Sequence, residues 1–182
     1  MEKKSGGFQD LKKIVIIGPE STGKSTLCEQ LARHYNTVWC PEYAREFLSR
    51  HGNRYSYDDL LTIAQGQLRL EDELLKSAGN GLYFIDTNMY VMQVWSEYVF
   101  GRCHQFILDK VVERKYDLYL LCAADLPWSY DELREYPDEA PRIELYNIYK
   151  SMLVEQNVPW TEISGSYEQR FSKAIQMIDA LI

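Results

Sequence analysis

The residues best suited to chemistry lie close together in the segment 18–25, whose sequence is GPESTGKS. It has the spacing of a phosphate-binding loop: glycine, four residues of any kind, glycine, lysine, and serine or threonine. Gly18 and Gly23 permit backbone angles that turn several N–H groups toward one anion. Lys24 can reach terminal phosphates, and Ser25 can hold a magnesium ion.

The sequence on both sides of this loop also fits the motif. The apolar run 13–17 predicts a buried strand, and the run 25–33 predicts a helix directly behind the loop. The start of that helix adds unpaired N–H groups and the positive end of the helix dipole. We therefore predict a nucleoside triphosphate site rather than a glycine-rich turn, with contacts from Gly18, Glu20, Ser21, Thr22, Gly23, Lys24, Ser25 and Thr26.

Asp86 ends a second apolar run, 82–85, at the place where an open parallel sheet forms its ligand crevice. A carboxylate there can bind magnesium, together with Ser25, or accept a proton from a substrate hydroxyl. The alternative is a cap for the helix that begins near Asn88. Thr87 follows Asp86, whereas many P-loop enzymes that hydrolyse ATP carry a glutamate there, so we expect transfer rather than hydrolysis.

Glu42 and Arg45 follow the short apolar run 37–40 and should face the same crevice. Because they are three residues apart on a predicted helix, they share a face and can offer an acceptor and a donor to a polar substrate. The alternative is a surface ion pair, which contributes little to stability.

The segment from Asp125 to Pro141 is charged, contains three prolines and is long for a plain connection. We predict a lid over residues 125–142, with an ordinary solvated loop as the alternative. An arginine that closes over the transferred phosphoryl group would stabilise its charge, and we favour Arg134 over Arg142 for this catalytic role.

The chain has 14 tyrosines, and an aromatic ring can stack on a planar base. By position, Tyr55, Tyr57 and Tyr90 are the best candidates, and we assign Tyr57 and Tyr90 to the substrate. For any single tyrosine, packing in the core or on the surface is the commoner explanation.

Strand and helix signals alternate along the whole chain. The expected strands are 13–17, 37–40, 82–85, 118–122 and 160–163, and the expected helices are 25–33, 42–50, a long one from 57, 88–100, 105–115, 143–156 and 167–182. This order requires a parallel sheet covered on both faces. We predict a three-layer α/β fold of the P-loop nucleoside triphosphate hydrolase and kinase type, with a five-stranded parallel sheet and a lid. Residues 1–182 are expected to form one domain, with 1–12 as a flexible tail.

Composition excludes several classes of function. A net charge of −7 argues against a broad nucleic-acid surface, and no apolar run is long enough for insertion into a membrane. The N-terminal residues are polar and lack the apolar stretch of a signal peptide. The 4 cysteines and 3 histidines are scattered, as in a reduced cytoplasmic protein without a zinc site. A homo-oligomer is left open.

Several segments resemble the kinase domain of NadR-type proteins, a P-loop small-molecule kinase family commonly grouped with AAA-type ATPases. They are the loop 18–25, Glu42-Tyr43-Ala44-Arg45-Glu46-Phe47, Phe84-Ile85-Asp86-Thr87, Pro127-Trp128 with Asp131 and Leu133-Arg134, and Ser166-Tyr167 with Arg170. The resemblance implies ATP- and Mg²⁺-dependent phosphorylation of the 5′-hydroxyl of ribosylnicotinamide, which gives nicotinamide mononucleotide in NAD salvage. It further implies that Trp128 binds ATP, that Ser164-Gly165-Ser166 lies beside the adenine, and that Glu42 and Arg45 bind the nucleoside.

Full NadR-type proteins carry an adenylyltransferase domain ahead of the kinase, but this chain has a short polar tail there and no His-x-Gly-His motif. Adenylyl transfer is therefore not expected. Two alternatives stay open: a kinase of another nucleoside or vitamin-like molecule, and a regulatory P-loop ATPase. A GTPase is disfavoured because no Asn-Lys-x-Asp motif occurs.

Overall fold

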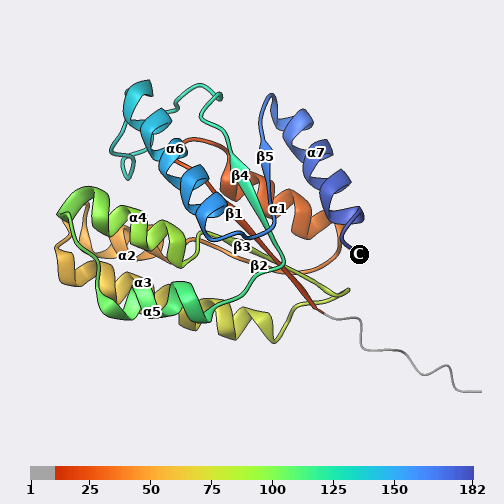
Figure 1. Cartoon of the computed structure of the whole chain (residues 1–182), viewed down its shortest axis with the longest axis horizontal. Helices are drawn as coiled ribbons and strands as arrows, with labels where there is room; N and C mark the ends of the chain where they lie inside the picture. The colour runs from red at the N-terminus through yellow and green to blue at the C-terminus, as the bar shows by residue number, and fades with distance from the viewer. Residues whose placement is uncertain (1–10) are drawn as a thin grey trace, which may run out of the picture.

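A computed structural model describes residues 11–182, and a five-stranded parallel sheet lies at its centre (Figure 1). The strands are β1 (Lys12–Ile17), β2 (Trp39–Cys40), β3 (Leu82–Asp86), β4 (Leu118–Cys122) and β5 (Trp160–Ile163), in the order β2-β3-β1-β4-β5. β1 pairs with β3 on one side, in register Ile16 to Asp86, and with β4 on the other. The predicted α/β fold with a five-stranded parallel sheet is confirmed.

Seven helices of residues 11–182 cover the sheet in two layers. They are α1 (Lys24–His34), α2 (Tyr43–His51), α3 (Tyr57–Leu75), α4 (Met89–Phe100), α5 (Gln105–Glu113), α6 (Glu139–Glu155) and α7 (Tyr167–Asp179). Helices α1 and α7 lie on one side of the sheet and α2 to α6 on the other (Figure 1).

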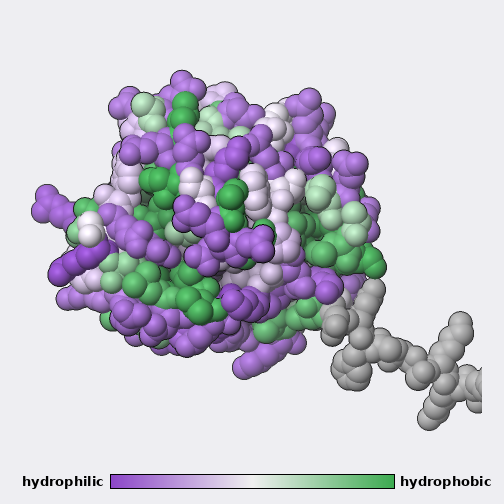
Figure 2. Space-filling model, in the orientation of Figure 1, coloured by the Kyte–Doolittle hydropathy of each residue, from purple (hydrophilic) through white to green (hydrophobic). Residues whose placement is uncertain are grey.

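Successive side chains of each strand enter different cores, because strand residues alternate between faces. Ile14 and Ile16 pack with α1 and α7, whereas Val15 and Ile17 pack with the larger layer. Both faces of the sheet are therefore buried, which explains why the strands read as continuous apolar runs. Most of the surface is hydrophilic in the view of Figure 2. Among the helices of residues 11–182, none has the length and apolar character needed to cross a bilayer.

Local signals account for where the helices begin. Ser56 and Ser166 each accept a hydrogen bond from the backbone three residues on, and complete capping boxes at the starts of α3 and α7. Asn88 caps α4 by accepting from the N–H of Tyr90. Asp86 is therefore free of the capping role that was its alternative interpretation.

The structure corrects several predicted boundaries. Helix α6 begins at Glu139 rather than at residue 143, with Pro141 in its first turn, where a missing N–H removes no helical hydrogen bond. Four residues of the predicted lid are thus helical. Lys12 opens β1 instead of ending a tail, and residues 1–10 of that predicted tail lie outside the described part of the chain. The second strand is shorter than predicted, and α5 and α7 end earlier.

Candidate active site

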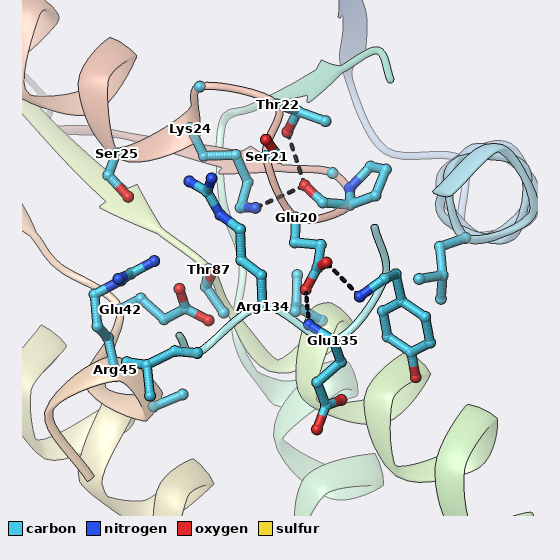
Figure 3. A pocket seen from close by; sticks show the side chains of 18 of the residues that line it. Glu20, Ser21, Thr22, Lys24, Ser25, Glu42, Arg45, Thr87, Arg134 and Glu135 are labelled. Carbon is cyan, nitrogen blue, oxygen red and sulfur yellow. Dashed lines mark hydrogen bonds between the residues drawn. The ribbon is translucent and has the colours of Figure 1, made fainter. Parts of the chain in front are cut away.

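A cavity of about 220 Å³ lies at the carboxyl ends of the strands (Figure 3). It is closed on one side by the phosphate-binding loop and on the others by α2, α4, α6 and the segment 125–142. Its lining consists of residues 18–26, Glu42, Ala44, Arg45, Leu48, Thr87, Val91, Trp95, Tyr98, Ser129, Leu133, Arg134, Glu135, Tyr136, Leu145, Tyr149 and Tyr167. The cavity brings Lys24, Ser25, Glu42, Arg45 and Arg134 together, from segments far apart in the chain.

The phosphate-binding loop has the backbone that its sequence predicts. Gly18 and Gly23 have φ angles of 144° and 77°, a region that other residues rarely adopt. A Cβ atom at Gly18 would lie 2.6 Å from the carbonyl oxygen of Cys122, so no larger residue fits there. The Thr22 hydroxyl and the Lys24 ammonium both donate to the Pro19 carbonyl, at 2.8 and 2.9 Å, and close the loop on itself.

Ser25 and Asp86 meet at the floor of the site. The Ser25 hydroxyl donates to Oδ2 of Asp86 at 2.5 Å, and the Thr87 hydroxyl donates to Oδ1 at 3.3 Å. Burial raises the pKa of Asp86, and the nearby Lys24 ammonium opposes that rise. A serine oxygen and a carboxylate oxygen at one point are the ligands that magnesium takes beside a phosphate.

Thr87 has a φ of 74°, which is an outlier for a β-branched residue. It is buried, and its N–H donates to the Ile16 carbonyl at 3.2 Å. The strained backbone is thus fixed by the sheet, and it turns the Thr87 hydroxyl onto Asp86.

Glu42 lies half-buried beside the same group of charges. Within residues 11–182 its carboxylate makes no hydrogen bond, and the dashed bonds of Figure 3 leave it free. Burial raises the pKa of Glu42, the charge of Asp86 raises it further, and Lys24 and Arg45 oppose both effects. A carboxylate with a raised pKa in a cavity is suited to accept a proton.

The segment 125–142 lies over the phosphate-binding loop and is fastened to it. Both oxygens of Glu20 accept hydrogen bonds from this segment, from the N–H of Tyr136 at 2.6 Å and of Glu135 at 2.9 Å. Arg45 forms an ion pair with Asp131 at 2.8 Å, which ties the segment to α2.

Arg134 extends from the segment 125–142 toward the side of the cavity on which Lys24 lies (Figure 3). Its guanidinium donates to the carbonyl and the hydroxyl of Ser129 within the same segment. Arg142, the other candidate, is buried in α6, donates to the Leu126 carbonyl at 3.4 Å and does not line the cavity.

The structure does not bring every candidate residue into the cavity. Tyr57 stacks on His104, and Tyr90 stacks on Tyr119 in the core, so neither ring lines the cavity and their predicted contact with substrate gains no support. Tyr55 accepts from the Trp95 indole and is also outside the lining.

The residues after β4 and β5 that were predicted to bind ATP likewise lie beside the cavity and do not line it. Trp128 packs edge-on against Tyr130, and its indole N–H is buried without a partner among the described residues. Ser164-Gly165-Ser166 follows β5, and Ser166 caps α7. Tyr167, directly after it, does line the cavity.

Sequence reasoning missed an aromatic wall opposite the phosphate-binding loop. Val91, Trp95 and Tyr98 lie on one face of α4, and Tyr136 packs edge-on against Tyr98. Tyr149 of α6 completes this wall. The spacing of residues 91, 95 and 98 is a signal for one helix face, but it does not distinguish a face on the core from a face on a cavity.

Comparison with known proteins adds two curated relatives. The Trifunctional NAD biosynthesis/regulator protein NadR of Escherichia coli (strain K12) is 32% identical over 173 residues, which are 92% of this chain and 42% of that protein. Its Salmonella typhimurium counterpart is 30% identical over 177 residues, 94% of this chain and 43% of that protein. The chain thus spans less than half the length of these relatives.

Solved structures of three proteins share the fold. A NadR protein in complex with NR superimposes with a TM-score of 0.80 at 23% identity, over 94% of this chain and 50% of that chain. The thymidylate kinase of Candida albicans gives 0.65 at 15% identity, covering 94% and 92% of the two chains. The deoxyadenosine kinase of M. mycoides with bound dATP gives 0.59 at 14%, covering 92% and 99%. A family model described as an AAA domain matches residues 13–170, which include the phosphate-binding loop, Asp86 and the segment 125–142, and this chain belongs to that family.

Proposed function

We propose that this chain is an ATP- and Mg²⁺-dependent kinase that phosphorylates the 5′-hydroxyl of a nucleoside, with ribosylnicotinamide as its substrate. One observation carries the proposal: a single cavity joins a phosphate-binding loop to a half-buried carboxylate, Glu42, that has no hydrogen-bond partner of its own among residues 11–182. The first is suited to hold a phosphoryl donor, and the second is suited to activate a hydroxyl acceptor.

On the donor side, the backbone of residues 18–25 holds the phosphates, and Lys24 leaves the Pro19 carbonyl to reach them. Ser25 and Asp86 would hold Mg²⁺, which neutralises charge on the phosphates when bound. Residues 11–182 contain no cluster of three or more histidine, cysteine, aspartate or glutamate side chains that could hold a metal, so further ligands would come from phosphates and water.

On the acceptor side, Glu42 takes the proton of the substrate hydroxyl. The hydroxyl oxygen forms a bond to the terminal phosphorus while the bond from that phosphorus to the bridging oxygen breaks, and ADP leaves. Lys24 and Arg134 stabilise the charge that develops on the phosphoryl oxygens. Arg45 contacts the sugar hydroxyls once the substrate competes with Asp131 for its guanidinium.

The aromatic wall supports a planar acceptor. Trp95, Tyr98 and Tyr136 offer ring faces and edges opposite the phosphate-binding loop, and such rings stack well on a base. The choice of ribosylnicotinamide is supported by the motifs that resemble NadR-type kinases and by the relatives named as NAD biosynthesis/regulator proteins. Another nucleoside or a vitamin-like molecule is the second candidate, and a regulatory ATPase is the third.

We also propose that the described residues act as one kinase domain, in which the segment 125–142 is the lid. The contacts of Glu20 and Ser21 with this segment support that role, because they attach it to the loop that would hold the donor.

The test is a phosphotransfer assay with the purified chain, ATP, Mg²⁺ and a panel of nucleosides that includes ribosylnicotinamide. We expect nicotinamide mononucleotide and ADP in equal amounts, and a rise in Tm with ribosylnicotinamide by mass action. A Lys24→Ala preparation made in parallel controls for contaminating kinases. Hydrolysis of ATP without any phosphorylated nucleoside would overturn the kinase proposal and favour the regulatory ATPase.

A further inference from the structure

Arg170, on the first turns of α7, is 2% exposed, and no role has been assigned to it so far. Its guanidinium donates to five acceptors: the carbonyls of Gly165 at 2.8 Å, Thr22 at 3.1 Å, Ile163 at 3.2 Å and Ala123 at 3.1 Å, and Oδ1 of Asp125. Every N–H direction of the side chain is used. A buried cation is tolerated when it is paired and fully hydrogen-bonded, and Asp125 supplies the pairing charge.

These five acceptors belong to three separate segments. Thr22 is in the phosphate-binding loop, Ala123 and Asp125 follow β4, and Ile163 and Gly165 end β5 and begin the turn after it. β1, β4 and β5 are parallel strands, so these segments meet at the same edge of the sheet. Asp125 strengthens the link, because its second oxygen accepts from the N–H of Gly165 at 2.6 Å.

The bond to Thr22 has a consequence for the phosphate-binding loop. In a trans peptide the C=O and the following N–H point in opposite directions, and the described residues have no cis peptide. By holding the Thr22 carbonyl, Arg170 fixes the N–H of Gly23 toward the opposite side of the loop. Gly23 lines the cavity, so this is an N–H that a phosphate would meet.

The bond from Arg170 to the Gly165 carbonyl fixes the turn that follows β5. Gly165 has a φ of 87°, and the turn it belongs to leads directly into Tyr167, which lines the cavity. A Cβ atom at Gly23 would lie 3.1 Å from the Tyr167 ring, so this ring already packs on the phosphate-binding loop. Arg170 therefore holds the phosphate-binding loop and the turn before Tyr167 at a fixed distance from each other, at the donor end of the cavity.

We propose that Arg170, paired with Asp125, is a positioning residue for the donor nucleotide. It aligns the phosphate-binding loop with the turn that leads into Tyr167, so that the loop and the Tyr167 ring, which both line the cavity, can contact the same nucleoside triphosphate. The proposal rests on the proposed function, since it presupposes that a nucleoside triphosphate binds there.

The test compares binding of ATP–Mg²⁺ by calorimetry, KM values for ATP and for the nucleoside, and Tm, in the wild type and in Arg170→Met and Arg170→Lys. We expect Arg170→Met to weaken ATP binding about tenfold or more, the size of effect expected when charge-assisted hydrogen bonds that hold a site are removed. KM for the nucleoside should stay within about twofold, and Arg170→Lys should recover part of the ATP affinity. A residue that serves stability alone would lower Tm without this split between the two substrates.

Arg114→Met is the matched control. Arg114 makes a bidentate ion pair with Asp72 at 2.6 and 2.7 Å and does not line the cavity, so its loss should lower Tm without a change in ATP affinity. Should Arg170→Met fail to fold, Asp125→Asn removes the pairing charge and is expected to weaken ATP binding in the same selective way. Unchanged ATP affinity in the folded variants overturns the inference, whereas a wild type that does not bind ATP overturns the proposed function itself.

Discussion

Two glutamates, Glu71 buried and Glu42 half-buried, lie at opposite ends of the sheet and differ in how they are partnered. Glu71, in α3, lies where the strands begin, and both its oxygens accept from the Tyr116 hydroxyl, at 3.1 and 3.0 Å. The guanidinium of Arg114 lies 3.7 Å from it. Glu42 lies where the strands end, faces the cavity, and has no hydrogen bond from its carboxylate within residues 11–182.

Burial raises the pKa of both carboxyl groups, so a shifted pKa alone does not separate them. Partners do. The protein satisfies Glu71 by itself, as expected of a structural group, whereas Glu42 is left for something that enters the cavity. A carboxylate without a hydrogen-bond partner at a cavity therefore indicates function where burial and a raised pKa do not.

Lys24→Ala should have the largest effect, a loss of turnover of about 10³-fold or more, because the terminal phosphates lose a fixed cation. Its ammonium makes one hydrogen bond in the structure, to the Pro19 carbonyl, so Tm should change little. Steady-state kinetics and thermal unfolding measure the two effects. Turnover close to that of the wild type would contradict the donor site.

Asp86→Asn should lower kcat by orders of magnitude, since the amide cannot replace a carboxylate that holds a metal beside Ser25. The raised pKa means that the ionised carboxylate is disfavoured in the folded protein, so a neutral isostere should leave Tm unchanged or higher. A variant that fails to fold would show that Asp86 serves the structure of the protein rather than its activity.

Glu42→Gln tests the unpartnered carboxylate directly. It should lower kcat by about 10²- to 10⁴-fold through loss of the base, without lowering Tm. In the wild type the base works only when deprotonated, so kcat/KM should fall with decreasing pH through a pKa above the ordinary 4.5 of a glutamate. The residual rate of Glu42→Gln should lack this limb in its pH–rate profile. If kcat/KM of Glu42→Gln still falls with decreasing pH as in the wild type, another group is the base, and Asp86 is the next candidate.

The parts of the site that the sequence predicts are local. Gly18 and Gly23 encode the loop by their own backbone freedom, and Asp86 and Glu42 follow apolar strands whose ends must meet in a parallel sheet. The contacts of Glu20 with the segment 125–142 are different. Glu20 accepts from residues more than a hundred positions away, and nothing near it in the sequence predicts these bonds.

For aromatic residues the sequence does not distinguish a site from a core. The positions of Tyr57 and Tyr90 in the chain predict substrate contact, yet their rings stack on His104 and Tyr119. Tyr98 and Tyr149, which do line the cavity, sit on amphipathic helices whose pattern is the same whether the face meets a core or a ligand. Only the packing of α4 and α6 against the sheet decides between these outcomes.

Glu71→Ala should have the smallest effect on activity and should act on stability instead. Removing the carboxylate leaves the Tyr116 hydroxyl without its acceptor, which costs about 1–3 kcal/mol of unfolding free energy, while kcat stays near the wild-type value. The pH dependence has a definite sign. A carboxyl group with a raised folded-state pKa stabilises fully below its unfolded value of about 4.5, and this contribution is lost as pH rises through the folded pKa. The stability difference between wild type and Glu71→Ala, measured by urea unfolding, should therefore be largest in acid and shrink toward neutral pH. A large fall in kcat with unchanged stability would show that Glu71, the glutamate with hydrogen-bond partners, serves function rather than stability.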